Sequence, residues 1–203
     1  MWIALVMAAA AHGAAHRAAD VVVYVHHGTE PPEVIAIAEA QAGRMLAGAG
    51  IKLQWELGTP RCHGRAEVIE VVLTAQADDK IRPGALACAT LGKNSGPRVE
   101  IFYNRVRAAG PAATVPAILA HVLAHEIAHV VEGVGRHSET GVMKAHWVAA
   151  DFYAMRTGSL PFAAEDVRLI GEWAARKRSA QLTADSGPAL GAALSSSAGG
   201  CRL

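Results

Sequence analysis

Residues 120–133 read AHVLAHEIAHVVEG, and the interpretation of the whole chain depends on this stretch. Most of its residues are apolar, so it predicts a single helix that is buried in the core. Among its few polar side chains, those of His125, Glu126 and His129 are placed for chemistry. Buried polar groups are costly unless they have partners, and a metal ion is the simplest partner that these three could share.

His125 and His129 are four residues apart, which places both imidazoles on one helix face, one turn from each other. Two ligands of a zinc ion are supplied in this way. Glu126 lies about 100° further round the helix, where it can reach a water activated by the metal without ligating the metal itself. This is the position of the general base in a zinc hydrolase. The alternative is that both histidines are hydrogen-bonded core residues and that Glu126 pairs with an arginine.

The residues after this helix predict a third ligand. Gly133 and Gly135 end the helix, because glycine allows the left-handed turn found at helix C-termini. The chain can then return toward the helix, and His137 follows the turn. Three protein ligands leave a fourth tetrahedral position open, as in catalytic rather than structural zinc sites. The sequence leaves further candidates for the third ligand, namely His146, Glu139, Asp151 and, within the helix, Glu132.

These residues resemble the metzincin clan of zinc peptidases. The resemblance lies in a helical His-Glu-x-x-His, a glycine turn, a third histidine and a Gly-Val-Met sequence at residues 141–143. It implies Zn2+ as the cofactor, a peptide or protein as the substrate, and His125, His129 and His137 as the metal ligands. It also implies that Glu126 is the general base and that Met143 belongs to a tight turn underlying the metal site.

The loop before the third histidine departs from the usual pattern of the clan, His-Glu-x-x-His-x-x-Gly-x-x-His. That pattern would place glycine at position 132 and histidine at position 135, where this chain has Glu132 and Gly135. The histidine comes two residues later, at His137, so the loop must be longer. The motif covers about residues 114–147, and over the rest of the chain the resemblance is one of architecture.

The chain before residue 114 predicts a sheet with a crossover helix. Continuous β-branched runs and alternating apolar runs predict the strands, and Pro31-Pro32-Glu33 is a typical helix start. The strand–helix–strand order at the beginning favours a parallel crossover, whereas the short links later on favour an antiparallel edge. The expected strands are residues 20–25, 51–57, 67–73, 86–91 and 98–103, and the helix ends near Gly48.

We therefore expect an α/β (α+β) fold with a mixed, mostly parallel five-stranded twisted sheet, two long helices including the metal helix with its methionine turn, and a C-terminal helix. By resemblance, residues 86–91 are the antiparallel edge strand above the cleft. An open edge of this kind can bind an extended peptide by strand addition. Thr114 and Pro116 are expected to begin the metal helix as its N-cap and a first-turn residue. Further helices are expected at 149–157 and 163–179.

Composition and the ends of the chain bear on compartment and partners. Residues 1–15 contain the short apolar run and small residues of a signal peptide, which predicts a secreted or periplasmic protein. A single domain is expected at 20–180, followed by a flexible tail rich in Ser, Gly and Ala at 181–203. Cys62 and Cys88 form either a disulfide, as export allows, or two unpaired thiols. The net charge of +1 predicts no nucleic-acid partner, and we expect a monomer with no stable membrane insertion.

The residues favour a zinc-dependent endopeptidase in which Glu126 takes a proton from water and passes it to the leaving amine. His146 or Tyr153 is a candidate to stabilise the oxyanion. His121, one turn before His125, is expected to be a hydrogen-bonded buried or cleft histidine, or else a group that supports the metal ligands. Two other functions fit the same residues: a non-catalytic zinc-binding or interaction domain with a metzincin-like fold, and a zinc amidase that acts on a non-peptide substrate.

Overall fold

The computed structural model describes residues 20–61, 66–76, 81–92 and 96–185. The expected signal peptide, Cys62 and Cys201 lie outside the described residues, as does residue 186 onward of the expected tail. Cys88 is described, and it carries a free thiol. The metal helix and every candidate ligand lie within the described part of the chain.

A five-stranded mixed sheet forms the centre of the fold and confirms the predicted fold class. The strand order is β2-β1-β3-β5-β4, and every neighbouring pair is parallel except β4 with β5. The antiparallel strand β4 is therefore an edge strand, as the sequence predicts for residues 86–91. The strands are β1 (Val21–His26), β2 (Leu53–Glu56), β3 (Glu67–Thr74), β4 (Ala87–Gly92) and β5 (Gly96–Phe102).

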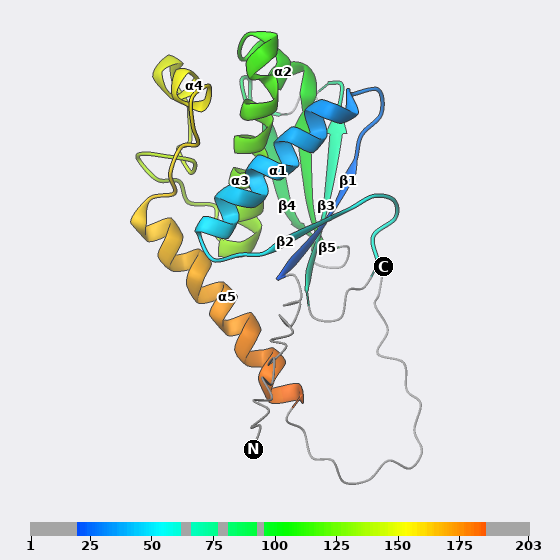
Figure 1. The fold of residues 1–203 in the computed structure, drawn as a ribbon, viewed down its shortest axis with the longest axis vertical. Helices are drawn as coiled ribbons and strands as arrows, with labels where there is room; N and C mark the ends of the chain where they lie inside the picture. The colour runs from blue at the N-terminus through cyan, green and yellow to red at the C-terminus, as the bar shows by residue number, and fades with distance from the viewer. Residues whose placement is uncertain (1–19, 62–65, 77–80, 93–95, 186–203) are drawn as a thin grey trace, which may run out of the picture.

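Two long helices, α1 (Pro32–Gly48) and α3 (Val115–Glu132), pack against each other and cover one face of the sheet (Figure 1). The valine run of β1 is buried on both of its faces, which explains why it lacks the alternation of a half-exposed strand. On the helix side, Ile35 and Leu46 of α1 lie in the same core cluster as the apolar face of α3. The helix α3 also contacts β4, so its polar residues lie near the antiparallel edge of the sheet.

The helix α3 is a core helix, as its sequence predicts. A window within Ala112–Glu132 is long and apolar enough to cross a membrane, but 83% of it is buried inside the fold. The helix ends at Gly133, whose φ of 68° is left-handed and whose N–H donates to the carbonyl of His129 at 3.0 Å.

The start of α3 differs from the prediction. Thr114 does not cap the helix, because its hydroxyl donates to the Pro111 carbonyl at 2.7 Å instead. A short 3-10 turn, Ala112–Thr114, precedes α3, so Thr114 already has helical dihedral angles (φ −99°, ψ −8°) rather than the extended ones of an N-cap residue.

A short helix, α2 (Tyr103–Ala108), was not predicted from the sequence. The strand β5 ends at Phe102 and the chain turns directly into α2, where Tyr103 and Val106 are buried. Six residues are too few for helical periodicity to stand out from a strand that precedes them without a break. The helix matters for the site because it carries Arg105, which is discussed below.

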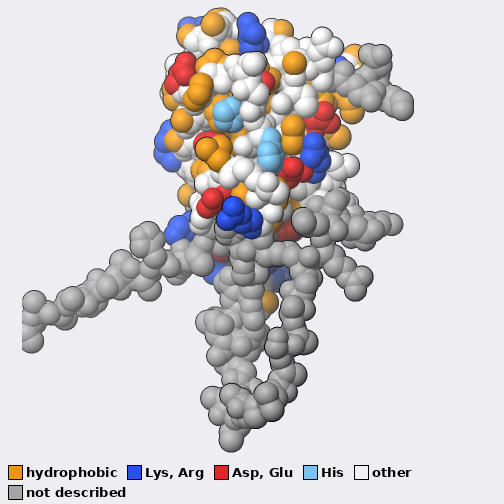
Figure 2. Space-filling model, turned by 90° about the vertical axis from the view of Figure 1, so that its right-hand side faces the viewer, with side chains coloured by type: hydrophobic (Ala, Val, Ile, Leu, Met, Phe, Trp, Pro, Cys, Tyr) orange, Lys and Arg blue, Asp and Glu red, His pale blue; other side chains and the backbone are white. Residues whose placement is uncertain are grey.

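Two helices follow the metal helix, α4 (Ala149–Met155) and α5 (Ala164–Asp185). The helix α5 continues past residue 181, where the sequence predicts a flexible tail to begin. Near its start the carboxylate of Asp166 is fully buried and accepts a hydrogen bond from the Ala163 N–H at 2.9 Å. On the face of the molecule seen in Figure 2, acidic and basic side chains are interspersed and do not gather by sign.

The segment between α3 and α5 makes a close backbone contact at Gly141. The residue has a left-handed φ of 76°, and the next residue, Val142, donates its N–H to the Pro161 carbonyl at 3.0 Å. A Cβ atom at position 141 would overlap that carbonyl oxygen. Glycine is therefore required at position 141 for two separate reasons, the dihedral angle and the space.

Replacing Gly141 by alanine is expected to lower the free energy of unfolding by about 3 kcal/mol, since a left-handed alanine costs about 1–2 kcal/mol and the overlap adds a packing penalty. The matched control is Gly133→Ala, because Gly133 also has a left-handed φ but has open space at its Cβ position. We expect the control to lose only about 1–2 kcal/mol. Urea unfolding of both metal-free variants measures the difference, and equal losses would contradict the close contact at Gly141.

Candidate metal centre

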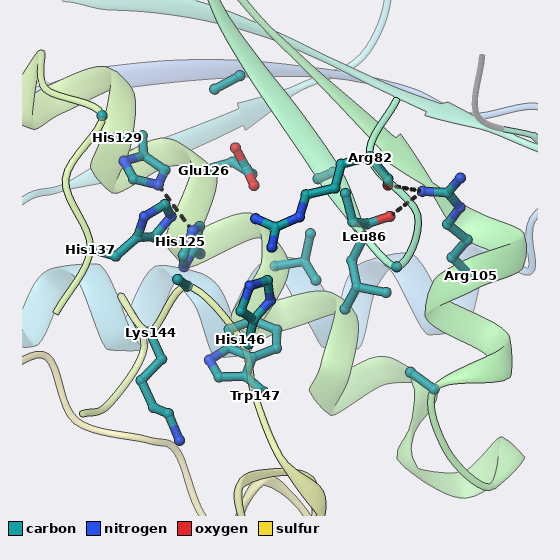
Figure 3. Close-up of a pocket in the computed structure, with 18 of the residues that line it drawn as sticks. Arg82, Leu86, Arg105, His125, Glu126, His129, His137, Lys144, His146 and Trp147 are labelled. Atoms are coloured by element: carbon teal, nitrogen blue, oxygen red, sulfur yellow. Dashed lines mark hydrogen bonds between the residues drawn. The ribbon is translucent and has the colours of Figure 1, made fainter. Parts of the chain in front are cut away.

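Three histidine side chains converge on one point beside the end of α3 (Figure 3). One ring nitrogen each of His125, His129 and His137 lies within 4.8 Å of the others, which is close enough for the three to hold a metal ion. The Nε2 atoms of His125 and His129 are 3.0 Å apart. The ring of His137 completes the group, with its centroid 5.4 Å from that of His125 and 4.9 Å from that of His129.

Backbone carbonyl groups fix the orientation of the two helix histidines. Nδ1 of His125 lies 2.8 Å from the Val142 carbonyl oxygen, and Nδ1 of His129 lies 3.2 Å from the Val134 carbonyl oxygen. A carbonyl oxygen only accepts hydrogen bonds, so the proton of each neutral ring is on Nδ1. Both Nε2 atoms then present lone pairs toward each other, an arrangement that is repulsive unless a cation lies between them.

A proton does not supply that cation at neutral pH. Burial lowers the pKa of His125 to about 4, although its hydrogen bond to Val142 opposes the shift. Burial is also the main cause of the lowered pKa values of His129 and His137. All three rings are therefore neutral near pH 7, which is the form in which imidazole binds a metal. Three converging, neutral nitrogen donors fit a metal ion with an open fourth position.

A buried ion-pair network holds the loop that carries His137. The guanidinium of Arg136 pairs with the carboxylate of Asp166, and the hydroxyl of Ser138 donates to the same carboxylate at 2.7 Å. Nε of Arg136 also lies 3.5 Å from a carboxylate oxygen of Glu132. The longer loop is thus tied on both sides of His137 to the end of α3 and the start of α5.

The turn that contains Met143 lies directly against the site. Val142 and Met143 are fully buried, and the Val142 carbonyl is the group that accepts the His125 proton. The turn is closed by the Lys144 N–H, which lies 3.4 Å from the Gly141 carbonyl. The Ser138 N–H also donates to the Met143 carbonyl at 2.8 Å, which joins this turn to the loop of the third histidine. Met143 itself packs in the hydrophobic core.

Glu126 is buried next to the histidines and lines the same cleft. Burial raises the pKa of its carboxyl group to about 7, and a hydrogen bond from the Ala89 backbone N–H partly opposes this effect. A carboxyl group that titrates near neutrality can both accept and release a proton at physiological pH. The hydrogen bond also attaches the carboxylate to the edge strand β4.

The cleft has a volume of about 750 Å³ and is bounded on one side by the edge strand β4. The Phe102 N–H donates to the Leu86 carbonyl at 2.9 Å. This bond makes Leu86 and Phe102 a hydrogen-bonded pair, and hydrogen-bonded and non-hydrogen-bonded pairs alternate along β4 and β5 from there. Ala87, Ala89 and Leu91 are consequently the residues whose peptide groups point away from β5. All three line the cleft. The Ala89 N–H is taken up by Glu126, so within the described residues the edge presents the peptide groups of Ala87 and Leu91 to the cleft.

The other candidates for the third ligand lie elsewhere. His146 is exposed and lines the cleft, but it does not belong to the histidine cluster (Figure 3). Asp151 pairs with Lys144 at 2.5 Å and accepts a hydrogen bond from the Val148 N–H at 2.8 Å at the start of α4. Glu139 is exposed, and among the described residues the only group of at least three possible ligands that lie close together is that of the three histidines.

His121 is a hydrogen-bonded buried residue, which confirms the first of its two predicted roles. Its Nδ1 lies 2.6 Å from the Ala117 carbonyl, and its Nε2 accepts the Leu160 N–H at 3.0 Å. Tyr153, a candidate to stabilise the oxyanion, is 65% exposed and does not line the cleft. His146 does line the cleft and remains the better placed of the two candidates.

Sequence reasoning missed two residues of the cleft. Trp147 lies edge-on to His125, with ring centroids 5.8 Å apart, and forms part of the cleft wall. Arg82 lines the opposite side, next to β4. The available signal was the Pro-Gly sequence at residues 83–84, because such a turn directly before an edge strand places its first residue at the rim of a cleft.

Comparison with known proteins identifies no relative: no family model matches the chain, and no curated protein matches it either.

Replacing His137 by alanine is expected to weaken zinc binding by about 100-fold or more, since the loss of even a supporting partner of a ligand costs roughly 10- to 100-fold. The matched control is His146→Ala, which removes an imidazole from the same cleft but not from the cluster. Calorimetric titration of the metal-free proteins with zinc measures both affinities. An unchanged affinity in His137→Ala, or an equal loss in His146→Ala, would exclude His137 as the third ligand.

Proposed function

We propose that this protein is a zinc-dependent endopeptidase of the metzincin type. The observation that carries the proposal is the position of Glu126, a buried carboxyl group beside three converging histidines at an open cleft. A purely structural metal site needs no such group, because nothing there must accept a proton. The His-Glu-x-x-His helix, the glycine turn before His137 and the buried turn with Met143 are the further features that support the comparison with this clan.

Zinc is the metal that we expect. His125, His129 and His137 would hold it through nitrogen atoms, and three such ligands with an open fourth position are typical of catalytic zinc. A bound zinc ion would supply Lewis acidity, which lowers the pKa of a coordinated water and polarises a carbonyl group. The backbone hydrogen bonds to Nδ1 of His125 and His129 keep both rings in the tautomer that this role requires.

Glu126 is the residue that moves the proton. Burial raises its pKa to about 7 in the metal-free protein, and the charge of a bound zinc ion would favour the carboxylate form, which can accept a proton from the attacking water. The same carboxyl group can then donate that proton to the leaving nitrogen as the peptide bond breaks. The Ala89 N–H holds the carboxylate in one orientation, which reduces the reorganisation needed during the transfer.

The edge strand β4 favours a peptide as the substrate. An extended peptide can pair with an open strand edge, and the outward peptide groups of Ala87 and Leu91 are placed for this. Side chains of alternate substrate residues would meet apolar surfaces of the cleft. These include Leu91 and Val134, which are exposed, and the rings of Trp147 and Phe152.

Replacing Glu126 by glutamine is expected to lower peptide hydrolysis by about 10²- to 10⁴-fold while zinc binding is retained, because the change removes the base but no ligand. Glu139→Gln is the matched control, since Glu139 is an exposed carboxylate of the neighbouring loop that does not line the cleft. Cleavage of a mixture of peptides by the zinc-loaded proteins, followed by mass spectrometry, measures turnover. Normal cleavage by Glu126→Gln would exclude this residue as the base, and no cleavage by the wild type would exclude a peptidase.

A further inference from the structure

Cationic side chains outnumber carboxylates among the described residues that line the cleft. Three cationic side chains, those of Arg82, Arg105 and Lys144, line it, whereas Glu126 is its only carboxylate among the described residues. Lys144 is neutralised by Asp151, with 2.5 Å between Nζ and Oδ2. A divalent metal ion would add further positive charge, so the cleft favours an anionic ligand.

Arg105 is the less available of the two cleft arginines, because Nη1 of its guanidinium already holds two backbone carbonyls. Nη1 of Arg105 donates to the backbone carbonyls of Arg82 at 3.1 Å and Ala85 at 2.8 Å, and the group lies over the ring of Phe102. These contacts join α2 to the turn that precedes β4. Arg105 therefore acts as a support for this turn.

Arg82 is the cleft cation for which the described residues provide no partner. Within the part of the chain that the structure describes, its guanidinium has no carboxylate within ion-pair distance and no side-chain hydrogen bond. Figure 3 shows the side chain extended into the cleft, toward the space between Glu126 and His146. An arginine in this position can form two parallel hydrogen bonds to a carboxylate, which adds geometric selectivity to the attraction of charge.

The backbone beneath Arg82 is fixed in place. The Ala85 N–H donates to the Arg82 carbonyl at 3.2 Å, which closes a four-residue turn with Pro83 and Gly84 at its centre. Gly84 has a φ of 84°, as the third residue of a type II turn requires. The two hydrogen bonds from Arg105 hold the same turn from the side of α2. Less conformational freedom is then lost when the Arg82 side chain binds a ligand.

We propose that Arg82 binds a carboxylate of the substrate, so that the cleft selects peptides with an acidic side chain or a free C-terminal carboxylate near the scissile bond. This selectivity rests on the proposed function, since it concerns the same cleft. A side-chain carboxylate and a C-terminal carboxylate would bind Arg82 in the same way, and the experiment below distinguishes them.

The experiment measures binding, so that it does not depend on turnover. Zinc-loaded Glu126→Gln protein is titrated with fluorescent pools of short peptides of random sequence. One position of each pool is fixed as either Glu or Gln, and the C-terminus is either a free acid or an amide. We expect the preferred acidic pool to bind about tenfold more tightly than its neutral counterpart. Adding Arg82→Gln should remove this difference without changing the affinity for neutral pools, and Arg82→Lys should keep only part of it.

Arg107→Gln is the matched control, because it removes the same charge from an exposed residue of α2 that does not line the cleft. A preference for Glu at the fixed position identifies a side-chain carboxylate, and a preference for the free acid identifies the C-terminus. Arg82→Glu should reverse the preference, so that pools with Lys at the fixed position bind best. Repeating the titration without zinc separates binding by Arg82 from binding of a carboxylate to the metal.

A preference for acidic pools that persists in Arg82→Gln would overturn the assignment. Equal affinity for all pools, or no binding of any pool, would overturn it as well. Turnover by the wild type is a separate readout: cleavage without any preference for a carboxylate leaves the endopeptidase in place and removes the role of Arg82. Binding of acidic pools through Arg82 without cleavage by the wild type would keep the role of Arg82 and exclude the endopeptidase.

Discussion

Two backbone carbonyl groups, those of Val134 and Val142, determine what the site can bind. They accept the Nδ1 protons of His129 and His125, and this directs both Nε2 lone pairs to the same point. Both carbonyls belong to the segment that returns toward the metal helix α3 after its glycine end, so the chemistry of the helix depends on a loop that follows it. The loop in turn depends on Gly141, where the backbone passes too close to Pro161 for any side chain. The two helix histidines would not direct both Nε2 lone pairs to one point if this segment took another path.

Three polar residues of α3 link the core to other parts of the chain. His121 binds the segment before α5 through the Leu160 N–H, and Glu126 binds the edge strand through the Ala89 N–H. Glu132 faces Arg136, which continues the connection to the buried carboxylate of Asp166. Each of these side chains would be costly to bury alone. His121 and Glu126 have hydrogen-bond partners, whereas among the described residues the buried Glu132 carboxylate has an ion pair with Arg136 but no hydrogen bond. The apolar faces of the helix hold it in the core, while the polar ones orient the walls of the cleft.

Much of the fold could be predicted from the sequence because its signals are local. The valine run of β1, the proline start of α1 and the spacing of His125 and His129 each depend on a few neighbouring residues. The features that were missed depend on tertiary contacts. The helix α2 is too short to show a helical period. The hydroxyl of Thr114 binds the turn that precedes α3 instead of capping the helix. The turn of Arg82 is held at the cleft by hydrogen bonds from Arg105, which is distant in sequence. His137 lies between these cases, since the glycines predict a turn but not where the chain goes afterwards.

X-ray absorption at the zinc edge of the zinc-loaded wild-type protein tests the metal centre most directly. The converging tautomers predict one zinc per chain with three imidazole nitrogens at about 2.0–2.1 Å and a fourth light ligand from solvent. The three-histidine site predicts no sulfur in the first coordination sphere, since no cysteine lies in the cluster. A spectrum with fewer imidazole ligands, a spectrum with sulfur ligands, or a protein that takes up no zinc would contradict the proposed centre.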